Sequence, residues 1–87
     1  MLKILFFYKE GDGPSKLQDE LLKNIEYIMK KKVEVEKINM DENKRTVEQY
    51  GIKEVPSIVI EKDGSVTDKF SGLTQDLFLR RALERNM

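Results

Sequence analysis

The sequence predicts an α/β fold with the element order β-α-β-α-β-β-α, a four-stranded mixed sheet and helices on both faces. Three observations predict it. The nearly continuous apolar segment 2–8 is typical of a central strand that is covered on both faces. A long amphipathic pattern at helical spacing follows it, and the pair Asp63-Gly64 is a strong signal for a two-residue hairpin turn. The chain has 87 residues, so we expect a single domain, residues 1–87, around one core.

The turn Gly11-Asp12-Gly13-Pro14 predicts the start of the first helix. Asp before a proline is a helix-start signal, because its side chain accepts bonds from free backbone N–H groups and proline has no N–H to lose. Lysines at 30–32 favour the C-terminal end of this helix. The spacing assigns Asp19 to the solvent face and the following residues to the core face: Leu17, Leu21, Leu22, Ile25, Ile28 and Met29.

Residues 33–38 alternate apolar and charged side chains, which predicts a second and more exposed strand. The right-handed crossover rule makes this strand parallel to the first. Residues 41–43 begin a short helix that Gly51 ends. Residues 57–60 form the third strand, and residues 66–70 return from the hairpin.

The last helix follows a break at Ser71-Gly72. We expect Thr74 or another nearby polar residue to cap it. Its core face consists of Leu79, Ala82 and Leu83. Leu77 and Phe78 cannot both share that face, so one of them is expected to be partly exposed.

Composition excludes several classes of function. Basic and acidic residues number 16 each, so no excess of positive charge indicates nucleic-acid binding. The absence of cysteine excludes thiol chemistry and thiolate metal sites, and the absence of histidine removes the usual general base. The segment 2–8 is shorter than the ~20 residues of a membrane-spanning helix. We therefore expect a cytoplasmic monomer without a cofactor, which binds neither nucleic acid nor membranes.

Three separated motifs resemble the thioredoxin superfamily in its small, glutaredoxin-sized form. The first is Gly11–Lys16 between an apolar strand and a long helix. The second is Lys37–Asn43 followed by Tyr50–Ser57, which resembles the family's "Y-G-I-x-x-x-P-T" segment. The third runs from Lys62-Asp63-Gly64 to Phe70-Ser71-Gly72, like the family's last hairpin and its "F-x-G" corner. Each motif is weak alone, but their order and spacing together are specific.

The resemblance implies roles for two sets of residues. Asp12 and Ser15 stand where the family has its redox cysteines, and Gly13 and Pro14 are retained between them. In the family, the residue before the motif proline binds an extended substrate through its backbone, and the proline is cis. Those roles would fall on Val55 and Pro56, with an ordinary trans proline as the alternative. Some thioredoxins carry a buried acid in the first strand, and the matching position here is Phe6.

The replacements keep the charge of the site and remove its nucleophile. A helix N-terminus stabilises a thiolate, and Asp12 places a carboxylate in the same field, worth ~0.3–1 kcal/mol to the helix. The Ser15 hydroxyl would need an adjacent base to act as a nucleophile, and no histidine exists to supply one. The segment 12–15 is therefore either only a helix cap or also part of a recognition patch with Val55 and Pro56.

The resulting hypothesis is a thioredoxin-like domain without thiol–disulfide activity that serves as a binding or structural module. Its expected partner is an extended polypeptide at Val55-Pro56. Two alternatives stay open. The chain is a cysteine-replaced form of a small oxidoreductase, in a family that serves cell redox homeostasis, or it is a designed or idealised scaffold without a partner. The acids Asp41-Glu42, with Glu54 or Glu61, lack the spacing of a calcium loop, so no metal site is predicted.

Overall fold

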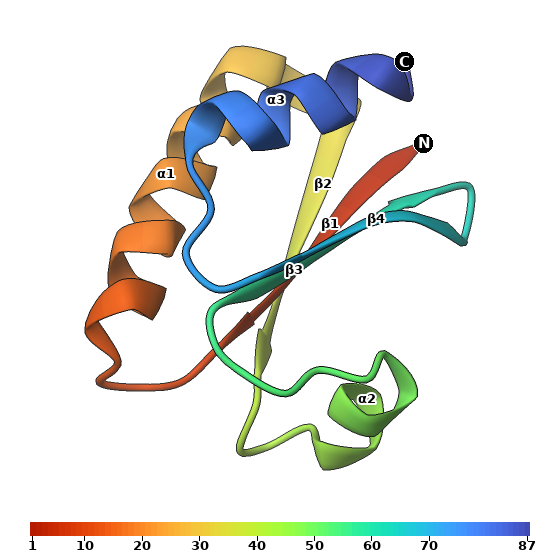
Figure 1. Ribbon diagram of the computed structural model, residues 1–87. Helices are drawn as coiled ribbons and strands as arrows, with labels where there is room; N and C mark the ends of the chain where they lie inside the picture. The colour runs from red at the N-terminus through yellow and green to blue at the C-terminus, as the bar shows by residue number, and fades with distance from the viewer.

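A four-stranded sheet with the order β2-β1-β3-β4 forms the centre of the molecule (Figure 1). The structure, a computed structural model, describes all 87 residues except the side chain of Lys31. β1 (Leu2–Tyr8) is parallel to β2 (Val33–Asn39) and antiparallel to β3 (Ser57–Lys62). β3 is in turn antiparallel to β4 (Ser65–Ser71). The predicted element order and the central position of β1 are confirmed.

The helices cover both faces of this sheet. α1 (Gly13–Met29) and α3 (Asp76–Arg85) lie together on one face, and α2 (Lys44–Gln49) lies on the other (Figure 1). The short 3-10 helix η1 (Lys30–Lys32) joins α1 to β2. No helix in the described part of the chain combines the length and the apolar character needed to cross a membrane.

Side chains that alternate along the strands divide the core into two clusters, because neighbouring residues of a strand point to opposite faces. One cluster lies under α1 and α3 and contains Ile4 and Phe6 of β1 together with Leu22 of α1. The other lies under α2 and contains Leu5, Phe7, Ile38, Ile52 and Val59. The continuous apolar run of β1 is therefore explained by burial on both faces.

The predicted core face of α1 is partly wrong. Leu17 and Ile28 are each 47% exposed, whereas Gln18 is completely buried. The buried positions Gln18, Leu22 and Ile25 form a narrow stripe, because α1 contacts the sheet and α3 along only one side. Leu17 and Ile28 fall outside this stripe although they match the helical period.

The expected side-chain cap of α3 is also wrong. Gln75 occupies the N-cap position, and its side chain makes no capping bond. Thr74 does not cap either, because its hydroxyl donates to the C=O of Gly72 at 3.0 Å. The backbone N–H of Thr74 donates instead to the side chain of Gln18.

More apolar residues of α3 are exposed than the sequence predicted. Leu77 is 51% and Phe78 is 52% exposed, so both lie outside the core rather than one of them. The predicted core face is confirmed, since all three of its residues are completely buried: Leu79, Ala82 and Leu83.

The hairpin between β3 and β4 turns at Asp63-Gly64, as predicted. Both residues have a positive φ, 51° at Asp63 and 87° at Gly64. Two consecutive positive φ values are the requirement of the type I′ turn, whose twist matches that of the flanking strands.

Candidate functional site

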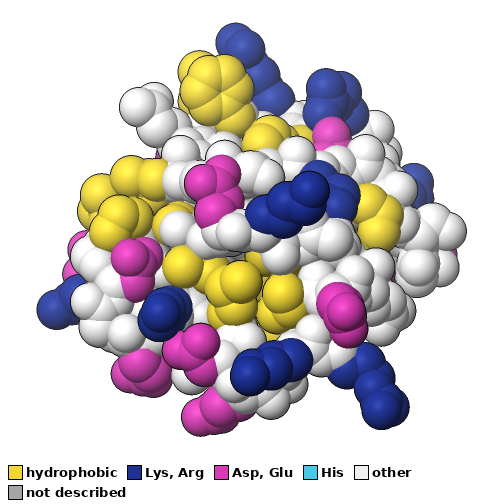
Figure 2. Space-filling view, turned by 60° about the horizontal axis from the view of Figure 1, so that its bottom comes forward, with side chains coloured by type: hydrophobic (Ala, Val, Ile, Leu, Met, Phe, Trp, Pro, Cys, Tyr) yellow, Lys and Arg dark blue, Asp and Glu magenta, His cyan; other side chains and the backbone are white. Residues whose placement is uncertain are grey.

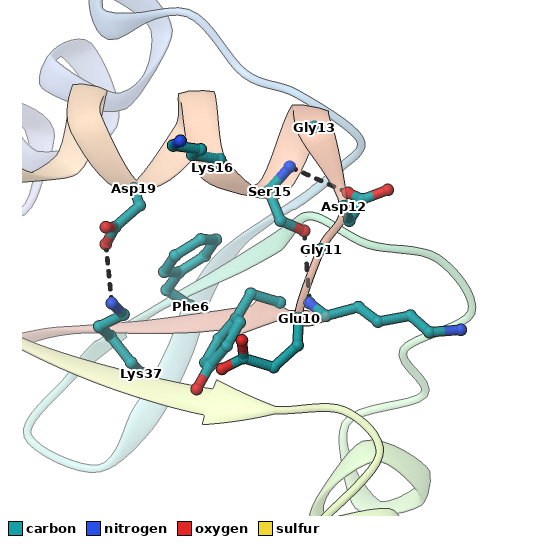
Figure 3. A pocket seen from close by; sticks show the side chains of 11 residues that line it. Phe6, Glu10, Gly11, Asp12, Gly13, Ser15, Lys16, Asp19 and Lys37 are labelled. Atoms are coloured by element: carbon teal, nitrogen blue, oxygen red, sulfur yellow. Dashed lines mark hydrogen bonds and ion pairs between the residues drawn. The ribbon is translucent and has the colours of Figure 1, made fainter.

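Asp12 caps the N-terminus of α1. Its backbone is extended, with φ −83° and ψ 121°, and its Oδ2 accepts the N–H of Ser15 at 2.9 Å. Its C=O accepts the N–H of Lys16 at 3.1 Å. Pro14 lies in the first turn and has no N–H to satisfy. The carboxylate therefore occupies the positive end of the helix and satisfies a donor that would otherwise be free (Figure 3).

The surroundings of Ser15 are those of a residue with a structural role, and they do not activate its hydroxyl as a nucleophile. The residue is 2% exposed, and its Oγ accepts the backbone N–H of Lys9 at 3.4 Å. No hydrogen bond in the described part of the chain joins this hydroxyl to a side chain that could act as a base. The hydroxyl therefore ties the loop before α1 to the first turn of the helix.

Removing the cap is expected to destabilise the fold. Asp12→Ala should lower the free energy of unfolding by about 0.5–2 kcal/mol at neutral pH, because the Ser15 N–H loses its acceptor. Asp12→Asn should cost less, since the amide oxygen still accepts that bond while the charge is lost. Chemical denaturation of the three proteins measures both differences. Equal stability of all three would show that Asp12 is not a cap.

A cavity of about 410 Å³ opens beside the start of α1 (Figure 3). Phe6 and Tyr8 of β1 line it, with ring centroids 5.6 Å apart. Phe6 is 1% exposed, so the position of the family's buried acid is apolar here. Three candidate site residues also line the cavity, namely Asp12, Gly13 and Ser15, whereas Val55 and Pro56 do not.

An ion pair between α1 and β2 also lies at this cavity. The Nζ of Lys37 is 3.1 Å from Oδ1 of Asp19 and 5.4 Å from the centroid of the Tyr8 ring. Lys23, one turn further along α1, lies 3.3 Å from Oδ2 of Asp19. Burial raises the pKa of the Asp19 carboxyl, but the hydrogen bonds from the two lysines outweigh burial and hold that pKa below its ordinary value. Sequence reasoning missed the Asp19–Lys37 pair, because its partners lie on different elements; only the i,i+4 spacing of Asp19 and Lys23 is visible locally.

The Val55-Pro56 segment lies at the end of the sheet where β1 leads into α1. Phe7 of β1 is opposite Ser57 of β3, so Pro56 lies beside the last residue of β1. The Val55–Pro56 peptide bond is cis. Pro56 is buried, and its C=O accepts the N–H of Gly72 at 2.8 Å. Val55 is half-buried, and no group among the described residues is hydrogen-bonded to its N–H or C=O.

This end of the sheet faces the viewer in Figure 2. Apolar side chains gather on the left and in the middle of the face, between Lys or Arg side chains and Asp or Glu side chains. The face therefore exposes apolar side chains with charged side chains among them.

The acidic residues considered for a metal site have other partners or stand apart. Glu61 is 9% exposed, and its Oε2 accepts the hydroxyl of Tyr50 at 2.7 Å. This hydrogen bond, followed by burial, raises the pKa of the Tyr50 hydroxyl. Within the described residues, no three acids, histidines or cysteines are grouped so that they could hold a metal ion. Glu61 therefore joins α2 to β3 through Tyr50.

Comparison with known proteins identifies the family. The model of the family described as Thioredoxin matches residues 2–85. The chain belongs to the thioredoxin family. The match includes every strand and helix of the fold and both candidate segments, 12–15 and 55–56.

Individual thioredoxins are similar to the chain in sequence and in structure. The thioredoxin of Rickettsia typhi is 36% identical over 72 residues, which are 83% of this chain and 69% of that protein. The X-ray structure of Fasciola hepatica thioredoxin has a TM-score of 0.88 at 26% identity and covers 99% of this chain and 81% of its own. A mutant thioredoxin from Halobacterium salinarum also has a TM-score of 0.88, at 25% identity over 98% of this chain and 74% of its own. The thioredoxin-like fold predicted from the sequence is confirmed.

The chemistry of this thioredoxin-family chain follows from its composition. None of its 87 residues is a cysteine, so it has no thiol to exchange with a disulfide. The first turn of α1 instead carries a carboxylate cap at Asp12 and a buried hydroxyl at Ser15.

Proposed function

We propose that this chain is a non-catalytic, polypeptide-binding member of the thioredoxin family. Its ligand is an extended segment of a partner protein that pairs with the backbone of Val55. The observation that carries the proposal is that the N–H and C=O of Val55, a half-buried residue, have no hydrogen-bond partner among the described residues. Backbone N–H and C=O groups are strong hydrogen-bonding groups, and an extended peptide satisfies both by pairing as an added strand does.

The surroundings of Val55 support the same ligand. Its neighbour Pro56 is held by the hydrogen bond from Gly72, so the segment is anchored before a peptide arrives. Gly13 and Pro14, which are exposed at the first turn of α1, are the second part of the proposed contact surface. An anchored backbone loses little conformational entropy on binding, which favours affinity.

The test is a titration of the ¹⁵N-labelled protein with insulin B chain whose cysteines are blocked with iodoacetamide. This probe is an extended polypeptide that can form no disulfide. We expect amide shifts to concentrate at Val55, Ser57 and Gly72. Absence of shifts at these residues up to the solubility limit of the probe would contradict the proposal.

A matched pair of variants locates the site. Val55→Lys should weaken binding of the blocked B chain by about tenfold, equivalent to ~1.4 kcal/mol, because an ammonium is placed where the peptide backbone lies. Val66→Lys makes the same change in β4, where Val66 is 47% exposed, and should leave the affinity unchanged. Equal weakening by both variants would indicate an effect of charge alone.

A further inference from the structure

The side chain of Gln18 holds the loop after β4 against α1. Gln18 is completely buried, and its amide makes two hydrogen bonds with the backbone of Thr74. Its Nε2 donates to the C=O of Thr74 at 3.0 Å, and its Oε1 accepts the N–H of Thr74 at 2.7 Å. The two residues are 56 positions apart in the chain. Thr74 is only 8% exposed, so without the amide both of its backbone groups would lose their partner in a buried place.

The same loop reaches the Val55-Pro56 segment. The hydroxyl of Thr74 donates to the C=O of Gly72 at 3.0 Å, and the N–H of Gly72 donates to the C=O of Pro56 at 2.8 Å. A Cβ built on Gly72 would lie 3.6 Å from Oε1 of Glu54, so the loop also approaches the residue before Val55. The loop 72–74 is therefore fixed to α1 at one end and to the candidate peptide site at the other.

We propose that Gln18 is a positioning residue for the Val55-Pro56 site. Through Thr74 and Gly72, its amide fixes the part of the loop against which a bound polypeptide lies. The peptide part of this inference rests on the proposed function, whereas the fixing of the loop is measurable without any ligand. An amide in the core stripe of α1 costs desolvation that only a matched donor and acceptor offset. An apolar side chain at position 18 would fill the same space without holding the loop.

Three variants test the role of the amide. Gln18→Leu keeps a side chain of similar size and removes both hydrogen bonds. Gln18→Glu always supplies an acceptor, but it supplies a donor only when its carboxyl is protonated, and then it matches the amide. Ile25→Val is the control, because Ile25 is equally buried on the same helix. The measurements are the hydrogen exchange and chemical shifts of the Gly72 and Thr74 amides, together with the affinity for the blocked insulin B chain.

Gln18→Leu should speed the exchange of both amides by about tenfold or more, since the loop opens locally without its anchor. The affinity for the blocked B chain should fall with it, by about fivefold or more. Ile25→Val should change neither measurement.

Gln18→Glu should recover the wild-type shifts of Gly72 and Thr74 as the pH falls and the carboxyl becomes protonated. Burial favours this neutral form of the carboxyl. A parallel titration of the wild-type protein removes the contributions of three nearby carboxylates, Asp19, Glu54 and Asp76. Recovery at low pH separates hydrogen bonding from packing, because protonation leaves the shape of the side chain unchanged.

The possible failures are distinguishable. Unchanged exchange at Gly72 and Thr74 in Gln18→Leu would overturn the inference even if the wild-type protein binds the peptide. A loosened loop with unchanged affinity would overturn it as well. Absence of binding to the wild-type protein would overturn the proposed function, and with it the role of Gln18 in binding.

Discussion

Replacing Asp12 and Ser15 together with cysteine is expected to give the chain dithiol activity. Asp12 lies at the positive end of α1, where its carboxylate accepts the N–H of Ser15. The same N–H and the helix dipole would stabilise a thiolate at position 12. A cysteine at position 15 would be buried one turn along, because Ser15 is 2% exposed. Reduction of insulin disulfides, with dithiothreitol as the final reductant, should rise clearly above the background of the wild-type protein.

Single variants control this experiment. Asp12→Cys or Ser15→Cys alone cannot form a disulfide within the chain, so each should fall well below the double variant. A double variant that folds but stays at background would mean that the scaffold lacks more than its sulfur atoms. The apolar ring of Phe6, where some family members have an acid, would then be the next position to change. Activity in the double variant would favour the interpretation that the chain is a cysteine-replaced form of a small oxidoreductase.

Truncating Phe7 is expected to remove a large part of the stability of the protein. Phe7 is completely buried under α2, with its ring centroid 5.9 Å from that of Tyr50. Phe7→Ala should cost about 3–5 kcal/mol, because it loses the burial of the ring and leaves a cavity. Domains of this kind have a total free energy of unfolding of about 5–15 kcal/mol. Urea denaturation should therefore show a midpoint far below that of the wild-type protein.

The matched control is the same substitution on the surface. Phe78 is 52% exposed at the start of α3, so Phe78→Ala should change the free energy of unfolding by about 0.5 kcal/mol or less. A similar loss for both variants would show that the core between the sheet and α2 does not carry the stability assigned to it.

Local chemistry made most of the fold predictable. The apolar run of β1, the turn pair Asp63-Gly64 and the cap residue Asp12 each act through neighbours a few positions away. Strand burial on two faces, a type I′ turn and a helix start are therefore visible in short windows of sequence. The order of these windows was enough to predict the sheet and its central strand. The candidate positions Asp12, Ser15, Val55 and Pro56 came from the family resemblance, because composition alone distinguishes none of them.

The sequence by itself thus determined the elements, their order, the core face of α3 and the loss of thiol chemistry, whereas the tertiary structure decided which residues of α1 are buried. Leu17 and Gln18 are consecutive residues, and the helical spacing of apolar residues favours burial of Leu17, whereas the structure buries Gln18. Gln18 is buried because its partner, the Thr74 backbone, is brought to it from 56 residues away. The pair of Asp19 with Lys37 likewise forms only when β2 packs beside α1. Contacts of this kind depend on which distant segments pack together, and a local pattern of residues does not predict that packing.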